Sequence, residues 1–379
     1  MFKTLFFYEL KKLVTNKVMA IAFIVLLLAG ATMGLNEEGR SSNRQAAKIS
    51  EDRNVLNGRM LDDALLSELS TKALDEYGLV WNQEDIAYED AATLVIETVG
   101  ENIPLSNIDA DLFYEKRAEM IDEGMTLTGI TDSERSCWEQ EEASVQIPFT
   151  VDNVNAPVAM ANGLSNIALL GLFYTAICLS GVFAGEYRLR TDKLILSSRN
   201  GSKKLLLAKI SAGLCFSLVS MLVITAAFVA VTISVWGTEG FGAMVQLQCP
   251  FAAVSMTQAD LIKHILVLLI ASTVLSALTA LALSELVRNE IAVIGIMIAV
   301  NVGSFAAGLF VPNDMRVLSQ AVSMAPMTFI SPRMLYEFRL IGWSGHYIKA
   351  FEFVPMLYLV LSLLLMLVLC RHYLQVKRK

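Results

Sequence analysis

Six apolar runs constrain the fold of this chain more than any other feature of its sequence. Each run is nearly free of Asp, Glu, Lys and Arg, and they cover residues 18–35, 166–185, 210–236, 265–284, 291–311 and 353–370. A helix needs about 20 apolar residues to cross a hydrocarbon core that is roughly 30 Å thick. Since lipid cannot satisfy backbone hydrogen bonds, helices are the expected form. The pattern predicts an all-α integral membrane protein with six transmembrane helices.

Composition agrees with this prediction, and the charges add an orientation. The chain is 55% hydrophobic and only 18% charged, which excludes an ordinary soluble globular protein. Residues 36–165 hold 27 of the 37 acidic side chains but only 9 of the 30 basic ones, a net charge of −18, so the rest of the chain carries +11. Basic residues precede the first run and follow the last. By the positive-inside rule, both termini are predicted to be cytoplasmic.

These spans and charges divide the chain into expected domains. Residues 1–17 form a leader, in which apolar positions such as Phe2, Phe6 and Leu13 share one helical face, typical of an interfacial amphipathic helix. A disordered basic leader is the alternative, and the small-x-small pattern at 29–31 leaves signal-peptide cleavage open. Residues 18–35 are the first span and 36–165 an acidic extracytoplasmic domain. Residues 166–371 contain the other five spans, with an outer segment at 312–352, and 372–379 form a cytoplasmic basic tail.

The acidic domain has a mainly helical pattern. Apolar residues repeat at helical spacing from Leu61 to Leu74, with Gly78 as the expected stop. Capping boxes are predicted at Ser106 with Asp109 and at Thr131 with Glu134, and helix breaks at Gly100 and Gly124. The negative charge suits either a cationic ligand or a solvated domain kept soluble by charge.

Catalytic and metal-binding motifs are missing from the sequence. No Gly-Lys dipeptide occurs, so a phosphate-binding P-loop is excluded, and the three His residues are isolated. We therefore expect no catalytic residue, no metal and no cofactor on this chain. Cys137 and Cys249 could form one outer bridge, although a disulfide framework is not expected. In the fifth span Asn301 and Ser304 could face a substrate path, or Asn301 could make an interhelical hydrogen bond.

The densest run of basic residues lies between the second and third spans, at residues 186–209. Apolar and charged residues alternate there in a way that favours a short surface helix, which Asn200 and Gly201 would end and Ser202 would follow as the next cap. The next helix would continue through Lys203 into the third span. Charge alone would equally suit an orientation signal in contact with anionic lipid headgroups.

The order of residues in this loop resembles that of ABC-2 type transporter permeases. In that family a Glu leaves the second span, and a Thr, a Leu pair, a Ser, an Arg and a Lys follow; here the corresponding positions are Glu186, Thr191, Leu194 with Leu196, Ser197, Arg199 and Lys209. Two positions depart from the pattern, since Arg190 stands for the usual Gly and Ser198 for the usual Pro. The resemblance extends over the whole chain, including the outer segment, where Pro312, Pro326 and Pro332 are similar to the family's re-entrant helices.

The resemblance implies the membrane subunit of an ATP-driven exporter of an amphiphilic, peptide or lipid-like substrate. It implies a coupling region, braced by the amino-terminal helix, that docks on a separate ATPase subunit, which alone binds ATP and Mg²⁺. It also implies a second permease subunit, identical or similar, and no contact with nucleic acid. The coupling residues would be Glu186, Arg188, Arg190, Thr191, Lys193, Leu194, Leu196, Ser197 and Arg199. The alternative is a membrane-anchored sensor with an acidic ligand-binding domain and no ATPase partner.

Overall fold

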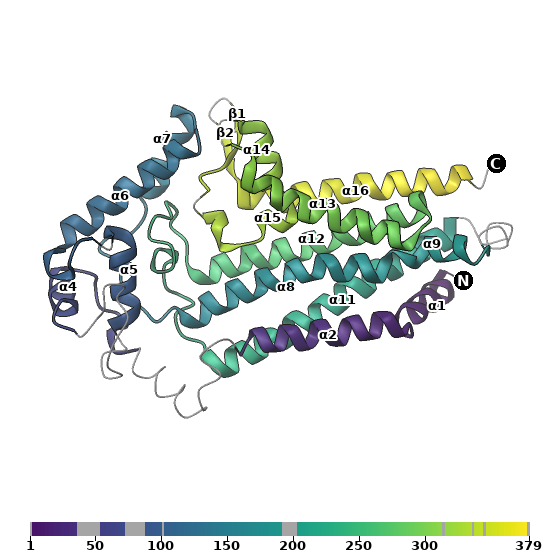
Figure 1. Cartoon of the computed structure of the whole chain (residues 1–379), viewed down its shortest axis with the longest axis horizontal. Helices are drawn as coiled ribbons and strands as arrows, with labels where there is room; N and C mark the ends of the chain where they lie inside the picture. Colours follow the sequence, from purple (N-terminus) through teal and green to yellow (C-terminus); the bar gives the residue numbers. More distant parts are fainter. Residues whose placement is uncertain are drawn as a thin grey trace.

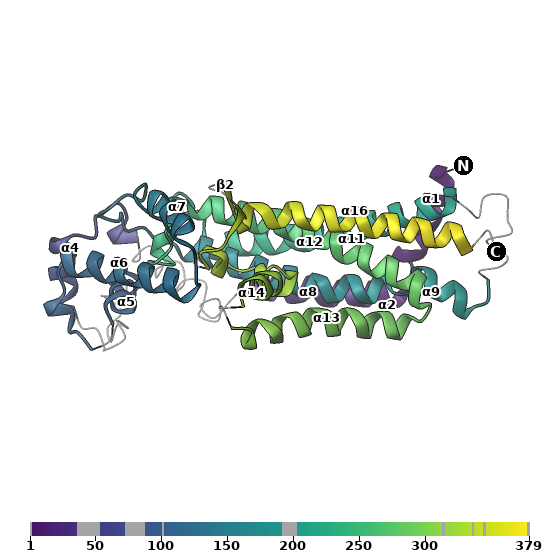
Figure 2. The same ribbon diagram turned by 90° about the horizontal axis from the view of Figure 1, so that it is seen from above.

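The computed structural model is an elongated helical bundle with a small helical domain at one end (Figure 1). It describes residues 2–35, 54–72, 88–100, 102–191, 203–312, 315–335, 337–343 and 346–376. Both chain termini lie at the end opposite the small domain, and a second view shows the same arrangement (Figure 2). We call these the terminal end and the domain end of the bundle.

Among the described residues, five helical spans are long and apolar enough to cross a membrane. They are formed by α8 (Asn155–Leu179) with α9 (Gly181–Arg188), then α11 (Lys203–Trp236), α12 (Gln258–Val287), α13 (Glu290–Phe310) and α16 (Ala350–Val376). A sixth crossing is available if α1 (Phe2–Val14) and α2 (Lys17–Met33), which meet at 66°, count as one bent span. The prediction of a mostly helical membrane protein is confirmed.

Local sequence explains where several helices begin. Asn16 caps α2 by accepting from Val18 N–H at 2.9 Å, and Asn289 caps α13 by accepting from the amides of Ile291 and Ala292. Thr257 and Asp260 form a capping box at the start of α12. These side chains supply acceptors for helix amides that have no partner within the helix. The α1–α2 bend lies just before the Asn16 cap.

Small residues allow α2 to approach α11 closely. A Cβ added at Gly30 would lie 3.3 Å from Ile224 Cγ2, and one at Gly34 would lie 2.9 Å from Val231 Cγ1. This Gly-x-x-x-Gly spacing is typical of tight helix contacts in membranes. By contrast α13 is the least buried span, with only 11% of its most apolar window buried inside the structure.

The domain-end helices surround a separate apolar core. They are α4 (Asp63–Leu69), α5 (Glu89–Val99) and the first half of α6 (Ala110–Leu127), whereas α7 (Asp132–Glu142) buries Trp138 in the core of the bundle. Leu61, Leu65, Val95 and Phe113 are buried there together with Phe149, from the chain that leads into α8. Short 3-10 turns cover Asn54–Leu56, Leu105–Asn107 and Val245–Leu247.

The local predictions for this domain have mixed outcomes. The Thr131–Glu134 capping box and the helix end at Gly100 are confirmed. The Ser106 box is wrong: Asp109 itself caps α6, and Ser106 bonds to Asn107. The break at Gly124 is also wrong, because α6 continues to Leu127. Gly124 serves packing instead, since a Cβ there would lie 2.6 Å from the Phe338 ring. Gly78 lies outside the described residues.

The segment between α13 and α16 packs on the domain end of the bundle. It contains α14 (Arg316–Ser323), α15 (Pro326–Phe329) and a 3-10 turn at Pro332–Leu335. A hairpin follows, in which β1 (Leu340–Trp343) pairs antiparallel with β2 (His346–Lys349), with Leu340 opposite Lys349. α14 and α15 both contact α13, and β2 runs directly into α16. All five cysteines are free, so Cys137 and Cys249 are not bridged.

Candidate coupling site at the terminal end

The candidate site begins with the way α9 ends. Thr191 N–H donates to Glu186 O at 3.0 Å, and Arg190 N–H donates to Tyr187 O at 3.1 Å. These two bonds form a Schellman motif, whose penultimate position requires a left-handed backbone. Arg190 occupies that position with φ 54°. Glycine adopts this conformation freely, whereas Arg190 adopts it at a steric cost.

Glu186 and Lys209 form a buried ion pair next to this turn. The two side chains are 12% and 0% exposed, and they join α9 to the first turns of α11. Lys209 Nζ also donates to Val182 O at 3.2 Å and lies 4.8 Å from the centre of the Phe183 ring. A buried ammonium group needs such partners, because losing one of them leaves a charge without compensation. The loop between the two helices is thus held at its base by one charge pair.

The amino-terminal helix contributes a second cation to this pair. Lys12 Nζ lies 3.8 Å from Glu186 Oε1 and 3.9 Å from Glu9 Oε2, and Glu9 is buried. α1 packs along α11, so its charged face closes over the α9–α11 corner. Within the leader predicted at 1–17, α1 is a helix over Phe2–Val14 that contacts this corner, while its role as an interfacial helix remains a prediction.

Two further residues, from α12, fix the position of α9. Ser284 Oγ accepts from Phe183 N–H at 3.0 Å and from Ala184 N–H at 2.9 Å, and donates to Ser180 O at 2.5 Å. These bonds satisfy backbone groups at the break between α8 and α9. Glu285, which is buried, accepts from Tyr187 OH at 2.9 Å and lies 3.4 Å from His372 Nδ1 of α16. The corner is therefore bonded to α11, α12 and α1, and reaches α16 through Glu285.

Arg188 differs from these buried groups because its side chain is 69% exposed. It donates to Glu290 Oε2 at 3.2 Å, at the start of α13. An exposed pair of this kind contributes little to stability, about 1 kcal/mol or less. Arg188 is thus a cation that a partner could contact without unfolding the corner.

The structure brings together only part of the predicted site. Glu186, Arg188, Arg190 and Thr191 lie on one turn, with Lys209 bonded to the first of them. Five other predicted residues lie outside the described residues: Lys193, Leu194, Leu196, Ser197 and Arg199. Most of the surface helix expected up to residue 198 also lies outside the described residues. The same is true of the helix end expected at Asn200 and Gly201 and of the cap expected at Ser202.

The predicted substrate-path residues Asn301 and Ser304 lie far along α13 from this corner. Asn301 Nδ2 donates to Met297 O at 2.8 Å, and Ser304 Oγ donates to Asn301 O at 2.7 Å. Both bonds stay within α13. Within the described part of this single chain, the interhelical hydrogen bond expected for Asn301 is therefore replaced by a local one.

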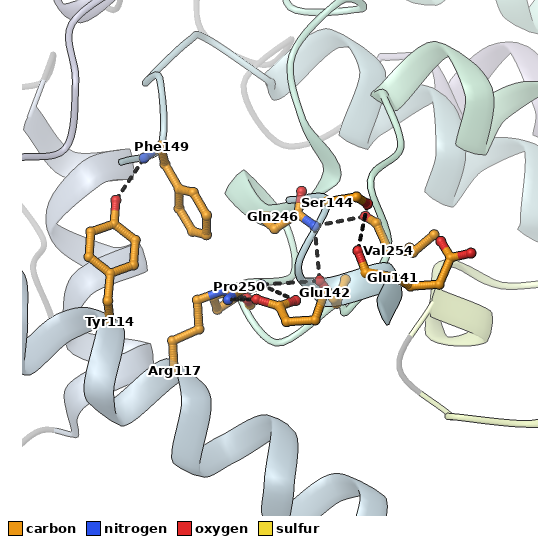
Figure 3. A network of polar contacts seen from close by, with 10 residues as sticks. Tyr114, Arg117, Glu141, Glu142, Ser144, Phe149, Gln246, Pro250 and Val254 are labelled. Carbon is orange, nitrogen blue, oxygen red and sulfur yellow. Dashed lines mark hydrogen bonds and ion pairs between the residues drawn. The ribbon is translucent and has the colours of Figure 1, made fainter. Parts of the chain in front are cut away.

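The domain end is built by a different set of contacts, centred on Arg117 of α6 (Figure 3). Its guanidinium group pairs with both oxygens of Glu142, with Nη2 to Oε2 at 2.9 Å, and Nε donates to Pro250 O at 2.6 Å. Nearby, Tyr114 OH accepts from Phe149 N–H at 2.7 Å, and burial raises the pKa of Tyr114 to about 12. Arg117 thus attaches the small domain to the loop between α11 and α12.

A second group of contacts attaches α7 to the segment between α13 and α16. Arg316 pairs with Glu134, and Lys349 Nζ lies 2.7 Å from Glu141 Oε2. Trp138 Nε1 donates to Phe338 O at 3.3 Å, with the two rings in an edge contact at 5.6 Å. Sequence patterns did not predict any of these pairs, since their partners lie far apart along the chain.

Comparison with known protein families decides what this architecture is. The model of the ABC-2 family transporter proteins matches residues 4–376. The chain belongs to the ABC-2 transporter family. It is therefore a multi-pass membrane component of an ABC transporter and is not itself the catalytic subunit. No curated protein and no solved structure matches it significantly.

Proposed function

We propose that this ABC-2 family chain couples a separate ATPase subunit to the export of an amphiphilic, peptide or lipid-like substrate. ATP and Mg²⁺ would bind to that ATPase subunit, and two permease chains, identical or similar, would form the path. The terminal end would face the cytoplasm and the acidic domain would face outward, with the protein in the cell membrane. The distribution of basic residues supports this orientation.

The buried Glu186–Lys209 pair is the observation that carries the proposal. It joins the turn that follows the second crossing to the helix of the third, so a push on this turn moves α9 and α11 together. Lys12 adds α1 to the same unit, and Ser284 adds α12. Because a packed element with few alternative arrangements transmits displacement well, this corner is suited to receive the motion of an ATPase.

Arg188 offers a test of where the ATPase docks. Arg188→Glu reverses a charge that is 69% exposed, and the matched control Lys263→Glu reverses one that is 71% exposed near the domain end. We expect R188E to weaken retention of the co-purifying ATPase about fivefold or more, as loss of a charged contact does. K263E should retain it fully. Equal retention by both variants would overturn the docking assignment.

The Glu186–Lys209 pair offers a separate test of transmission. Glu186→Gln alone leaves Lys209 buried and unpaired, which should cost about 3–5 kcal/mol of stability. Glu186→Gln with Lys209→Met removes both charges and should restore most of the thermal stability. We expect this double variant to bind the ATPase but to lose substrate-stimulated ATP hydrolysis. If the double variant kept full substrate-stimulated ATP hydrolysis, the pair would have only a structural role and would not transmit motion.

A further inference from the structure

A cavity of about 930 Å³ lies at the terminal end, between α1, the α8–α9 corner and the start of α13. Its walls are mostly apolar, and several of its apolar side chains are well exposed: Val18 at 61%, Ile177 at 40% and Ile291 at 82%. Ligand cavities in proteins range from about 300 to 1,000 Å³. The space is therefore large enough for a lipid headgroup with the upper part of its chains.

Five charged residues line this cavity. They are Glu9 and Lys12 of α1, Glu186 and Arg188 of α9, and Glu290 of α13. Glu186 is already neutralised by the buried Lys209. Two cations and two carboxylates remain, so the lining of the cavity has both signs of charge and no net charge.

Two of these groups, Lys12 and Glu290, are accessible to a ligand. The Lys12 side chain is 50% exposed, and its ion pairs of 3.8 and 3.9 Å are longer than hydrogen bonds. Glu290 lies over two glycines of α9, since a Cβ at Gly181 or Gly185 would be 3.2 or 3.1 Å from its Oε1. The absence of side chains at these glycines lets the Glu290 carboxylate pack against α9 at the wall of the cavity.

We infer that this cavity binds a membrane phospholipid whose headgroup is zwitterionic. Lys12 would contact the phosphate, Glu290 would contact the ammonium group, and Ile177 and Ile291 would contact the chains. The inference deepens the proposed function, which places this cavity at the level of the inner leaflet. A headgroup with only negative charge would bring that charge close to Glu290 without supplying a cation to it, and would bind more weakly.

Native mass spectrometry of the purified full chain tests this inference without the ATPase. The probes are phosphatidylethanolamine and phosphatidylglycerol with identical acyl chains. We expect the wild type to retain one phosphatidylethanolamine with about fivefold preference, which corresponds to one charged contact of about 1 kcal/mol. Glu290→Lys should shift the preference toward phosphatidylglycerol. Equal retention of both lipids by the wild type would overturn the assignment of a zwitterionic ligand.

A second variant tests the location of the lipid. Ile291→Trp places a larger side chain in the cavity, whereas Ile298→Trp alters the same helix at a position that does not line it. We expect I291W to lose the retained lipid and I298W to keep it. Lipid retained equally by both would overturn the location. Because lipid binding is measured on the isolated chain, failure to find an ATPase would leave this result unaffected.

Discussion

At the scale of single residues, the turn that ends α9 holds Arg190 in an unfavourable backbone conformation. The Schellman bonds of Arg190 and Thr191 require a left-handed residue between the helix and the Thr, and Arg190 has φ 54°. Glycine adopts this conformation freely, whereas a residue with a Cβ pays about 1–2 kcal/mol. Arg190 therefore holds a left-handed backbone although it carries a Cβ.

We therefore predict that Arg190→Gly stabilises the protein. The gain should be about 0.5–1 kcal/mol, because glycine removes the steric cost but increases the entropy of the unfolded chain. Arg190→Ala should give no gain, since it keeps the Cβ. Thermal unfolding in detergent measures both variants. A melting temperature that does not rise for R190G would contradict the importance of this conformation.

At the scale of helices, α7 depends on one buried carboxylate. Burial acts to raise the pKa of Glu134, but hydrogen bonds from Arg316 and from the Thr131 amide and hydroxyl outweigh it, so that the pKa lies below its ordinary 4.5. A carboxyl whose pKa is lowered by folding stabilises the protein above its unfolded pKa, and this contribution is lost as the pH falls toward the folded value. The contact between α7 and α14 should therefore weaken in acid.

Glu134→Gln should isolate this effect, since Gln can still accept a hydrogen bond from the Thr131 amide. At pH 7 we expect E134Q to be less stable than wild type by about 2 kcal/mol, as for a charge-assisted hydrogen bond. The difference should shrink steadily as the pH falls below about 4.5. Glu139→Gln, an exposed change on the same helix, should have little effect at any pH. Thermal unfolding across pH would contradict this account if the E134Q deficit were constant.

At the scale of the whole molecule, the two ends of the bundle are organised around different contacts. At the terminal end, charges join α1, α9 and α11. At the domain end, Arg117 and Glu142 hold the loop between α11 and α12, while α7 holds α14 and the β1–β2 hairpin. Since β2 continues into α16, the small domain is connected to helices that also pass through the terminal end. A displacement at one end therefore has a continuous route of packed helices to the other.

The sequence predicted those features of the fold that are determined by residues within a single helix. Apolar length predicted the spans, and Thr131 with Glu134 predicted a helix start, because both signals lie within one element. Gly124 was misassigned as a break, since its role is set by Phe338 on a distant segment. The sequence pattern in the loop included both Glu186 and Lys209, but it did not predict that they form an ion pair, because the two residues lie on different helices. The roles of Ser284 and Arg117 likewise depend on partners far along the chain.

Purification of the tagged chain from its native host, followed by mass spectrometry of what remains bound, tests the central claim most directly. Our account predicts a stoichiometric partner with a Walker-type ATP-binding motif, retained by the wild type and weakened by Arg188→Glu. Reproducible absence of such a partner from intact protein would contradict the account, and would favour a membrane-anchored sensor with an acidic ligand-binding domain.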